Sequence, residues 1–191
     1  MVEHAHKVCP WWLGYSLLSP FRKWVQRQDP AKILAPYVQP GMTVLEPGPG
    51  MGYFTLEAAR LVGPAGKVVV VDLQPRMLKA LAKRAQRAGL SERIETRQAP
   101  SGEELGIGDL AGKVDFILAF SMAHEVSDPG RFFKDLFRAA KPGCRLLIAE
   151  PPLHVKKSDF EASLEKAQTC GFVMENRLSI PSSYSALLVK T

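Results

Sequence analysis

The stretch VLEPGPGMGYFT, residues 44–55, decides the fold of this chain. It opens with apolar residues typical of a buried strand, reaches an acid at Glu46, and then has a glycine at every second position. A helical pattern follows at once. Glycine lets the backbone turn tightly and lets a ligand approach the main chain, and the free N–H groups of the following helix form a weakly positive cradle. We therefore predict a ligand-binding loop at the carboxyl end of a first parallel strand, where open α/β sheets bind cofactors.

The spacing of the glycines separates two classes of cofactor. A dinucleotide fingerprint, G-x-G-x-x-G/A, needs a small third residue close to the pyrophosphate. The corresponding position here is Tyr53, and the chain has E-x-G-x-G-x-G instead, from Glu46 through Gly48 and Gly50 to Gly52. The Glu46 carboxylate would repel a pyrophosphate but attract a cationic amine. This pattern resembles motif I of the class I S-adenosylmethionine (SAM) methyltransferases, whose glycine loop wraps the amino-acid end of the cofactor.

A second acid, Asp72, follows at the distance that this resemblance implies. It ends the apolar run KVVVVD, residues 67–72, which is typical of a buried strand, and lies twenty residues after Gly52. An acid at the end of a second strand accepts hydrogen bonds from ribose hydroxyls in Rossmann-like folds. Asp72 can also cap the helix that begins near Pro75, and the two roles are compatible.

Composition predicts one globular domain. The chain has 191 residues, of which 46% are hydrophobic and 23% are charged. It contains no run of about 18 apolar residues and no basic-then-apolar signal pattern, so we expect a cytoplasmic protein without a membrane partner. Three widely spaced cysteines, Cys9, Cys144 and Cys170, argue against a disulfide framework. The net charge is +6, but the basic residues are spread along helices without interleaved aromatic residues, so nucleic acid is not an expected partner.

Residues 1–29 differ from the rest of the chain. They hold all three tryptophans and two of the four histidines. We expect this segment to form an N-terminal lid over a substrate pocket, with His6, Cys9 and Tyr15 as candidate substrate-binding residues. The series His4-x-His6-x-x-Cys9 also has the donor types of a metal or metalloid site. Its spacing matches no established zinc pattern, and packing is a third alternative, so we predict no metal.

Residues 30–191 are expected to form the SAM-binding methyltransferase domain. Patterns of apolar residues, caps and breakers predict helices over 30–37, 53–62, 75–88, from Asp128-Pro129 onward, and from a capping box at Ser158–Glu161 onward. They predict strands over 43–46, 67–72, 93–97, 113–120, 145–150, 172–178 and 185–190. This alternation predicts an α/β fold. The resemblance implies a Rossmann-like three-layer sandwich whose seven-stranded, mostly parallel sheet ends in an antiparallel hairpin.

The segment after the predicted fourth strand holds the candidate catalytic residues, His124 and Glu125. It lacks the Asn-Pro-Pro-Tyr or Asp-Pro-Pro-Tyr motif expected for methylation of amide or adenine nitrogens. Instead, residues 121–126 resemble the corresponding segment of small-molecule methyltransferases, including the ubiquinone/menaquinone-biosynthesis-like and arsenite groups. An imidazole titrates near neutral pH and can act as a general base. Glu125 can orient His124, contact substrate or cap, and His124 can alternatively bond to a neighbouring loop.

The resemblance implies SAM as cofactor and S-adenosylhomocysteine as product. The candidate cofactor-binding residues are Glu46, Gly48, Gly50, Gly52, Asp72, Leu73, Gln98, Ala99 and Phe120. Many family members carry an acid after the third strand that contacts the adenine amino group, and this chain has none there. Gln98 or Ser101 can replace it, and Glu103 lies nearby.

His154, after the predicted fifth strand, is a further candidate substrate-binding residue. Together with His4, His6 and His124 it raises the alternative of a polar, metal-assisted site, which Glu125 and Glu150 can complete. We expect a small-molecule acceptor and a monomer or homodimer. Two other functions are retained: methylation of RNA or protein, and non-catalytic SAM binding.

Overall fold

The computed structural model describes residues 28–191. The elements are α3 (Pro30–Leu34), β1 (Thr43–Pro47), α4 (Thr55–Leu61), β2 (Lys67–Asp72), α5 (Pro75–Arg87), η1 (Ser91–Arg93), β3 (Ile94–Gln98), η2 (Gly108–Leu110), β4 (Val114–Phe120), η3 (Ala123–Glu125), α6 (Pro129–Ala139), β5 (Ala140–Glu150), α7 (Lys157–Thr169), β6 (Phe172–Arg177) and β7 (Tyr184–Lys190). The candidate lid residues His4, His6, Cys9 and Tyr15 lie outside the described residues.

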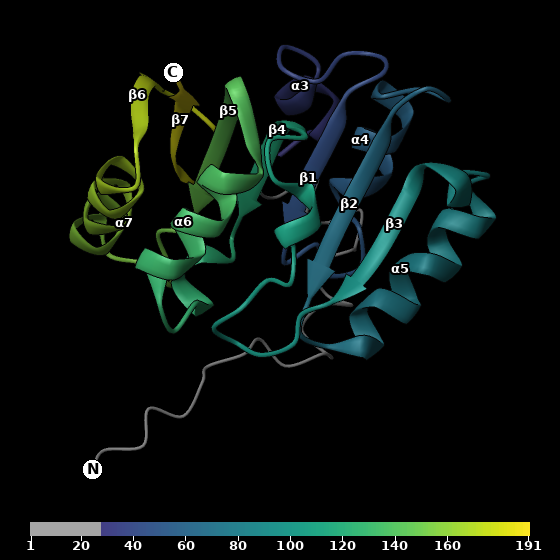
Figure 1. Cartoon of the computed structure of the whole chain (residues 1–191), viewed down its shortest axis with the longest axis horizontal. Helices are drawn as coiled ribbons and strands as arrows, with labels where there is room; N and C mark the ends of the chain where they lie inside the picture. The colour runs from purple at the N-terminus through teal and green to yellow at the C-terminus, as the bar shows by residue number, and fades with distance from the viewer. Residues whose placement is uncertain (1–27) are drawn as a thin grey trace.

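The strands form one seven-stranded sheet in the order β3-β2-β1-β4-β5-β7-β6. All pairs from β3 to β5 are parallel, whereas β7 is antiparallel to both β5 and β6. The predicted fold class is therefore confirmed, including the C-terminal hairpin. The strand order reverses at β1, which pairs with β2 on one side and β4 on the other, and such a switch point is where open α/β sheets bind ligands. The arrowheads of β1, β2 and β3 lie at one edge of the sheet (Figure 1).

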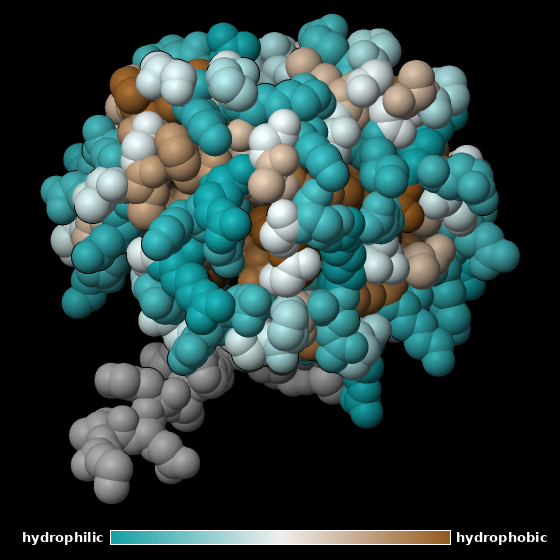
Figure 2. Space-filling view, in the orientation of Figure 1, coloured by the Kyte–Doolittle hydropathy of each residue, from teal (hydrophilic) through white to brown (hydrophobic). Residues whose placement is uncertain are grey.

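Two apolar layers cover the two faces of the sheet. On one face, Val44 and Val68 belong to a buried cluster with residues of α3, α4 and α5. On the other face, Leu45 and Val69 belong to a cluster with residues of α6 and α7. Covering both faces explains why β1 and β2 read as continuous apolar runs rather than as alternating ones. The face seen in Figure 2 is mostly hydrophilic, with apolar side chains showing in separate places.

Two predicted boundaries differ from the structure. β5 begins at Ala140 rather than at residue 145, because Ala140 already pairs with Val114 before a register shift between Val114 and Phe116. The predicted capping box is wrong. Helix α7 follows Lys156, whose side chain makes no cap bond, and the Ser158 hydroxyl donates to the Asp159 carboxylate instead of to the backbone.

Gly171 lets α7 turn directly into β6. Its φ is +111°, and a Cβ there would lie 2.7 Å from the Phe137 ring. That ring has little freedom to move. It packs edge-on against Phe172 at 5.2 Å between centroids, and the Lys190 ammonium lies 4.4 Å from its centroid. Backbone conformation and packing therefore both require glycine at this position.

We expect Gly171→Ala to lower the free energy of unfolding by about 2–4 kcal/mol, the sum of left-handed backbone strain and overpacking. Gly143→Ala is the matched control. Gly143 also has a positive φ, +80°, but a Cβ there would meet no atom within 4 Å, so we expect about 1–2 kcal/mol from strain alone. Urea denaturation followed by circular dichroism measures both values. Equal losses would contradict the contact with Phe137.

Candidate active site

One cavity opens at the carboxyl edge of β1, β2 and β4. It has a volume of about 210 Å³ and is lined by the end of β1 and the glycine loop, the end of β2, the loop after β3, and the segment that follows β4. These segments meet at the point where the strand order reverses. The predicted ligand loop thus forms one wall of a cavity at the expected end of the sheet.

The glycine loop reaches the cavity through Gly48 and Gly50. Both have positive φ, +65° and +54°, and both line the cavity. A Cβ at Gly50 would meet no atom within 4 Å, so open space lies beside its main chain. Gly52 differs, because a Cβ there would lie 2.9 Å from the Leu81 side chain of α5. Gly50 therefore leaves room for a ligand, whereas Gly52 allows the loop to approach α5 closely.

Glu46 brings a buried carboxyl group to the cavity. It is 3% exposed and accepts a hydrogen bond of 2.6 Å from the Thr55 hydroxyl. Burial raises the pKa of Glu46 to about 7, and the bond from Thr55 opposes this rise. A cationic amine beside it would restore its ionised form. The Glu46 carboxyl group therefore fits the cationic amine at the amino-acid end of SAM.

Asp72 occupies the end of β2 and connects two neighbouring segments. Its Oδ1 accepts the Gln74 N–H at 2.8 Å. Burial raises the pKa of Asp72 to about 6, while backbone hydrogen bonds from Gln74 and Gly50 oppose the rise. Asp72 thus joins the glycine loop to the start of α5 while also lining the cavity. The capping and ligand-binding roles are geometrically compatible.

His124 is held by a carboxylate distant in the sequence. Its Nδ1 lies 2.5 Å from Glu150 Oε2, and Glu150 Oε1 accepts the Ala123 N–H at 2.7 Å. The Glu150 side chain is 2% exposed. Burial lowers the pKa of His124, but the bond to Glu150 and the charges of Glu150 and Glu125 outweigh it, so the pKa is raised overall. His154 stacks beside it, with 6.5 Å between ring centroids and an angle of 5° between the rings.

The structure brings most, but not all, of the predicted site residues to the cavity. Those that line it are Glu46, Gly48, Gly50, Asp72, Leu73, Ala99, Phe120 and Glu125. Gly52, Gln98, His124 and His154 lie outside the lining, although Ser101 and Glu103, the other candidates after the third strand, are part of it. Sequence reasoning missed Thr55 as the partner of Glu46. It also missed Met122, whose side chain would lie 2.7 Å from a Cβ at Gly48.

Residues 28–191 contain neither a metal-binding cluster nor a membrane-spanning helix. No group of three or more His, Cys, Asp or Glu side chains in this range is placed to hold a metal ion. The described members of the alternative metal-assisted grouping, His124, His154, Glu125 and Glu150, therefore do not form such a site by themselves, and His4 and His6 lie outside the described residues. No described helix combines the length and apolar character needed to cross a bilayer.

Sequence comparisons with known proteins agree with the fold and with the position of the cavity. A family model described as a methyltransferase domain matches residues 38–179. The ubiquinone/menaquinone biosynthesis C-methyltransferase UbiE of Escherichia coli K12 is 34% identical over 113 residues, which cover 59% of this chain and 44% of the relative. UbiE of Pasteurella multocida is 32% identical over 113 residues and is covered to 41%. The chain thus spans less than half the length of these curated relatives.

Solved structures show the same fold over nearly the whole chain. A SAM-dependent methyltransferase from Aquifex aeolicus superposes with a TM-score of 0.84 at 24% identity, covering 96% of this chain and 100% of the other. A putative S-adenosyl-L-methionine-dependent methyltransferase from Methanococcus maripaludis gives 0.77 at 14% identity, covering 100% and 98%. The family match confirms the resemblance carried by the glycine loop and implies S-adenosylmethionine as the cofactor. The chain belongs to the methyltransferase domain family.

Proposed function

We propose that this protein is a SAM-dependent methyltransferase that acts on a small-molecule acceptor in the cytoplasm, as a monomer or homodimer and without a nucleic-acid partner. One observation carries the proposal: a buried carboxyl group, Glu46, and a partly buried one, Asp72, meet the open main chain of Gly50 in a single cavity at the switch point of the sheet. This arrangement suits a ligand with a cationic amine at one end and neutral hydroxyls in the middle.

Each part of the cavity has a role in this proposal. Glu46 binds the cofactor's ammonium group, Asp72 accepts hydrogen bonds from the ribose hydroxyls, and Gly48 and Gly50 let the backbone approach. Leu73, Ala99 and Phe120 supply apolar walls, while Gly52 and Gln98 support the loops from outside the lining. SAM supplies an electrophilic methyl group. The chain's contribution is to align the reactants and to exclude water.

The acceptor side of the proposal rests on the segment after β4 and on the relatives. UbiE is named as a C-methyltransferase, which supports a carbon acceptor on a small molecule. In our proposal His124 removes a proton from the acceptor at Nε2, because Nδ1 is engaged by Glu150. Glu125 contacts the acceptor from the cavity wall.

The same proposal assigns the remaining substrate contacts to His154 and to His6, Cys9 and Tyr15 of the N-terminal lid. The last three lie outside the described residues. His154 follows β5 and stacks on His124, which places it beside the proposed base. An acceptor bound there would lie between the loop after β4 and the loop after β5.

The first test is calorimetric titration of the full chain with SAM and with S-adenosylhomocysteine. We expect micromolar binding that Asp72→Ala weakens by about 1–3 kcal/mol, the cost of losing hydrogen bonds to a charged group. Glu175→Ala is the control and should leave the affinity unchanged, because Glu175 lies on β6 and pairs with Arg145 of β5 across β7, outside the cavity lining. A panel of small carbon, oxygen and nitrogen acceptors, with S-adenosylhomocysteine formation as the readout, then tests transfer. Failure of the wild type to bind either ligand would exclude the proposal.

Proton linkage provides a second test. Because Glu46 and Asp72 have pKa values raised to about 7 and about 6, both are partly protonated near pH 6.5 without ligand. A bound amine and bound hydroxyls favour the ionised carboxylates, so binding should release protons and affinity should fall as the pH drops from 7 to 5. Calorimetry at pH 6.5 in buffers of different ionisation enthalpy measures the release. Glu46→Gln should reduce it, and proton uptake by the wild type would contradict these assignments.

The third test concerns the His124–Glu150 pair. We expect Glu150→Gln to lower the pKa of His124, measured from the imidazole C–H resonances by NMR, and Glu125→Gln to lower it less, since Glu125 acts only through its charge. A pKa raised by folding stabilises the protein below the unfolded value and loses that effect as the pH rises through the folded value. Glu150→Gln should therefore cost more stability at pH 5.5 than at pH 8.5. If Glu125→Gln lowered the pKa of His124 more than Glu150→Gln does, Glu125 and not Glu150 would be the main partner of His124.

A further inference from the structure

Two segments of the chain face each other across the cofactor cavity. We name residues 99–107, between β3 and η2, the β3 loop, and residues 121–132, which include η3 and the first turn of α6, the η3 segment. Ser101 and Leu105 line the cavity from the β3 loop, and Met122 and Val126 line it from the η3 segment. In Figure 1 the β3 loop runs along the edge where β1, β2 and β3 end. Any movement between these segments changes the access of a ligand to the cavity.

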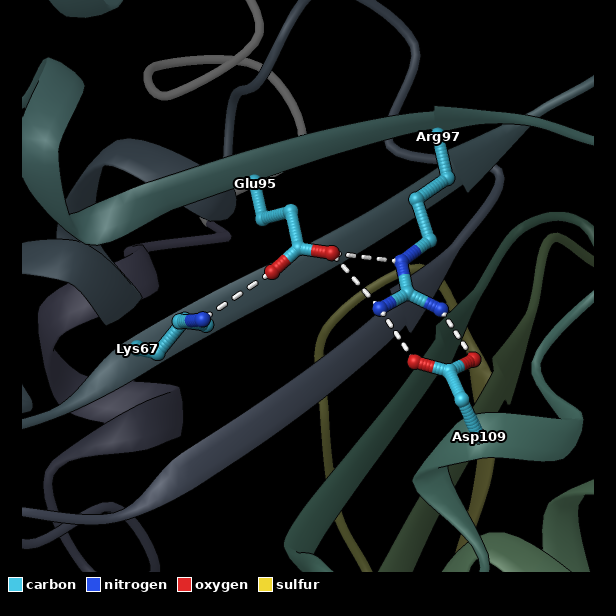
Figure 3. A network of polar contacts seen from close by, with 4 residues as sticks. All are labelled: Lys67, Glu95, Arg97 and Asp109. Atoms are coloured by element: carbon cyan, nitrogen blue, oxygen red, sulfur yellow. Dashed lines mark hydrogen bonds and ion pairs between the residues drawn. The ribbon is translucent and has the colours of Figure 1, made fainter.

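The base of the β3 loop is fastened by a network of charges. Arg97, at the end of β3, donates two hydrogen bonds of 2.6 and 2.9 Å to the Asp109 carboxylate of η2. Its Nε donates to Glu95 at 2.7 Å, and Lys67 of β2 bonds to the other oxygen of Glu95 at 3.0 Å. Figure 3 shows these four side chains joined in a row. Bidentate geometry restricts rotation as well as distance, so the two ends of the loop are held together.

Buried apolar residues also fix both ends of the β3 loop. Ala99 is 8% exposed and Ile107 is 4% exposed, and both belong to the core cluster beneath α6. The Ala99 N–H also donates to the Asp72 carbonyl at 3.0 Å. The ends of the loop are therefore part of the folded core.

The tip of the β3 loop, residues 101–104, is attached more weakly than its ends, although the neighbouring Leu105 packs against the core cluster. Polar contacts join it to the η3 segment: a hydrogen bond of 3.2 Å from the Ser127 hydroxyl to the Gly102 carbonyl, and an ion pair of 3.3 Å between Arg131 and Glu104. The side chains of the ion pair are 46% and 49% exposed. Exposed pairs of this kind contribute little and are screened by salt. The polar contacts of the tip are therefore weaker than those of the base.

We propose that the β3 loop is a gate over the cofactor cavity, hinged at the Arg97–Asp109 pair and latched to the η3 segment by Arg131–Glu104 and Ser127–Gly102. The inference rests on the proposed function, because the cavity it controls is the proposed cofactor site. When the latch opens, the tip moves away from Met122 and Val126, and the ligand exchanges. When it closes, the ligand is enclosed between the two segments.

A removable crosslink tests the gate directly. The double variant Gly102→Cys, Ser127→Cys joins the two sides of the latch when oxidised, with the bond verified by mass spectrometry. We expect the oxidised protein to associate with and release S-adenosylhomocysteine at least about tenfold more slowly than the wild type in surface plasmon resonance, and dithiothreitol to restore both rates. The single variant Ser127→Cys controls for pairing with the native cysteines. Wild-type exchange through a verified disulfide would overturn the gate.

Charge reversal tests the latch without a crosslink. Arg131→Glu replaces attraction to Glu104 by repulsion and should speed dissociation of S-adenosylhomocysteine about fivefold, and adding Glu104→Arg should restore a rate close to the wild type. Arg145→Glu, at an exposed pair that is outside the cavity lining, is the matched control and should leave the rate unchanged. This series decides the question if the disulfide does not form.

Ionic strength should change the dissociation rate of S-adenosylhomocysteine in opposite directions in the wild type and in Arg131→Glu. Added salt should speed dissociation from the wild type, where it screens an attraction, and slow it from Arg131→Glu, where it screens a repulsion. S-adenosylhomocysteine carries no net charge, so its own salt dependence is small. Normal binding with unchanged rates in every variant would overturn the gate alone, whereas no binding to the wild type would remove the proposed function together with the gate.

Discussion

The burial of Glu46 and the partial burial of Asp72, at the ends of adjacent parallel strands, are the constraint on which the rest of this site depends. Glu46 and Asp72 lose much of their hydration, and removing a carboxylate from water is costly unless hydrogen bonds or opposite charges compensate. The compensation comes from neighbours that must be placed accurately: the Thr55 hydroxyl for Glu46 and the backbone N–H groups of Gly50 and Gln74 for Asp72. The two carboxyl groups that face the cavity therefore also hold the glycine loop, the first turn of α4 and the start of α5 in position. Since folding raises both pKa values, these carboxyl groups lower the stability of the ligand-free protein as the pH rises toward 7, and a bound cation reverses that effect.

The parts of the structure that the sequence predicts well are those whose cause is local. The strand, acid and alternate glycines of residues 44–55 are contiguous, and the distance to Asp72 is set by one helix, so the fold class and one wall of the cavity could both be predicted. Gly52 shows the limit of such patterns. It shares the spacing of Gly48 and Gly50, yet its contact is with Leu81 on another helix. The start of β5 differs from the prediction because Ala140 joins the sheet through a partner, Val114, that no local pattern reveals.

The partner of His124 illustrates the same limit at the candidate catalytic site. Glu125 is its neighbour in sequence and was the natural candidate to orient it, but on η3 the two side chains diverge: Glu125 lines the cavity, and His124 bonds to Glu150 on the adjacent strand. Glu150 is 26 residues away, and only the parallel pairing of β4 with β5 brings it close. The failed capping box has a similar origin, since Ser158 has a carboxylate partner in Asp159 that competes with the backbone. Residue types alone do not decide between competing partners.

The bond between Glu150 and the η3 segment also links the two halves of the cavity. Glu150 holds both the Ala123 N–H and the His124 ring, which sets the orientation of η3 and hence the position of Met122 immediately before it. The Met122 side chain in turn lies so close to Gly48 that a Cβ there would be 2.7 Å from it. A shift of η3 would therefore press on the glycine loop or leave a gap beside it, because close-packed side chains transmit displacement. The buried carboxylate at the end of β5 thus helps to set the wall formed by β1, even though it does not line the cavity. The ends of three neighbouring strands, β1, β4 and β5, are therefore coupled, and the cavity walls formed by the glycine loop and by the η3 segment cannot be positioned independently.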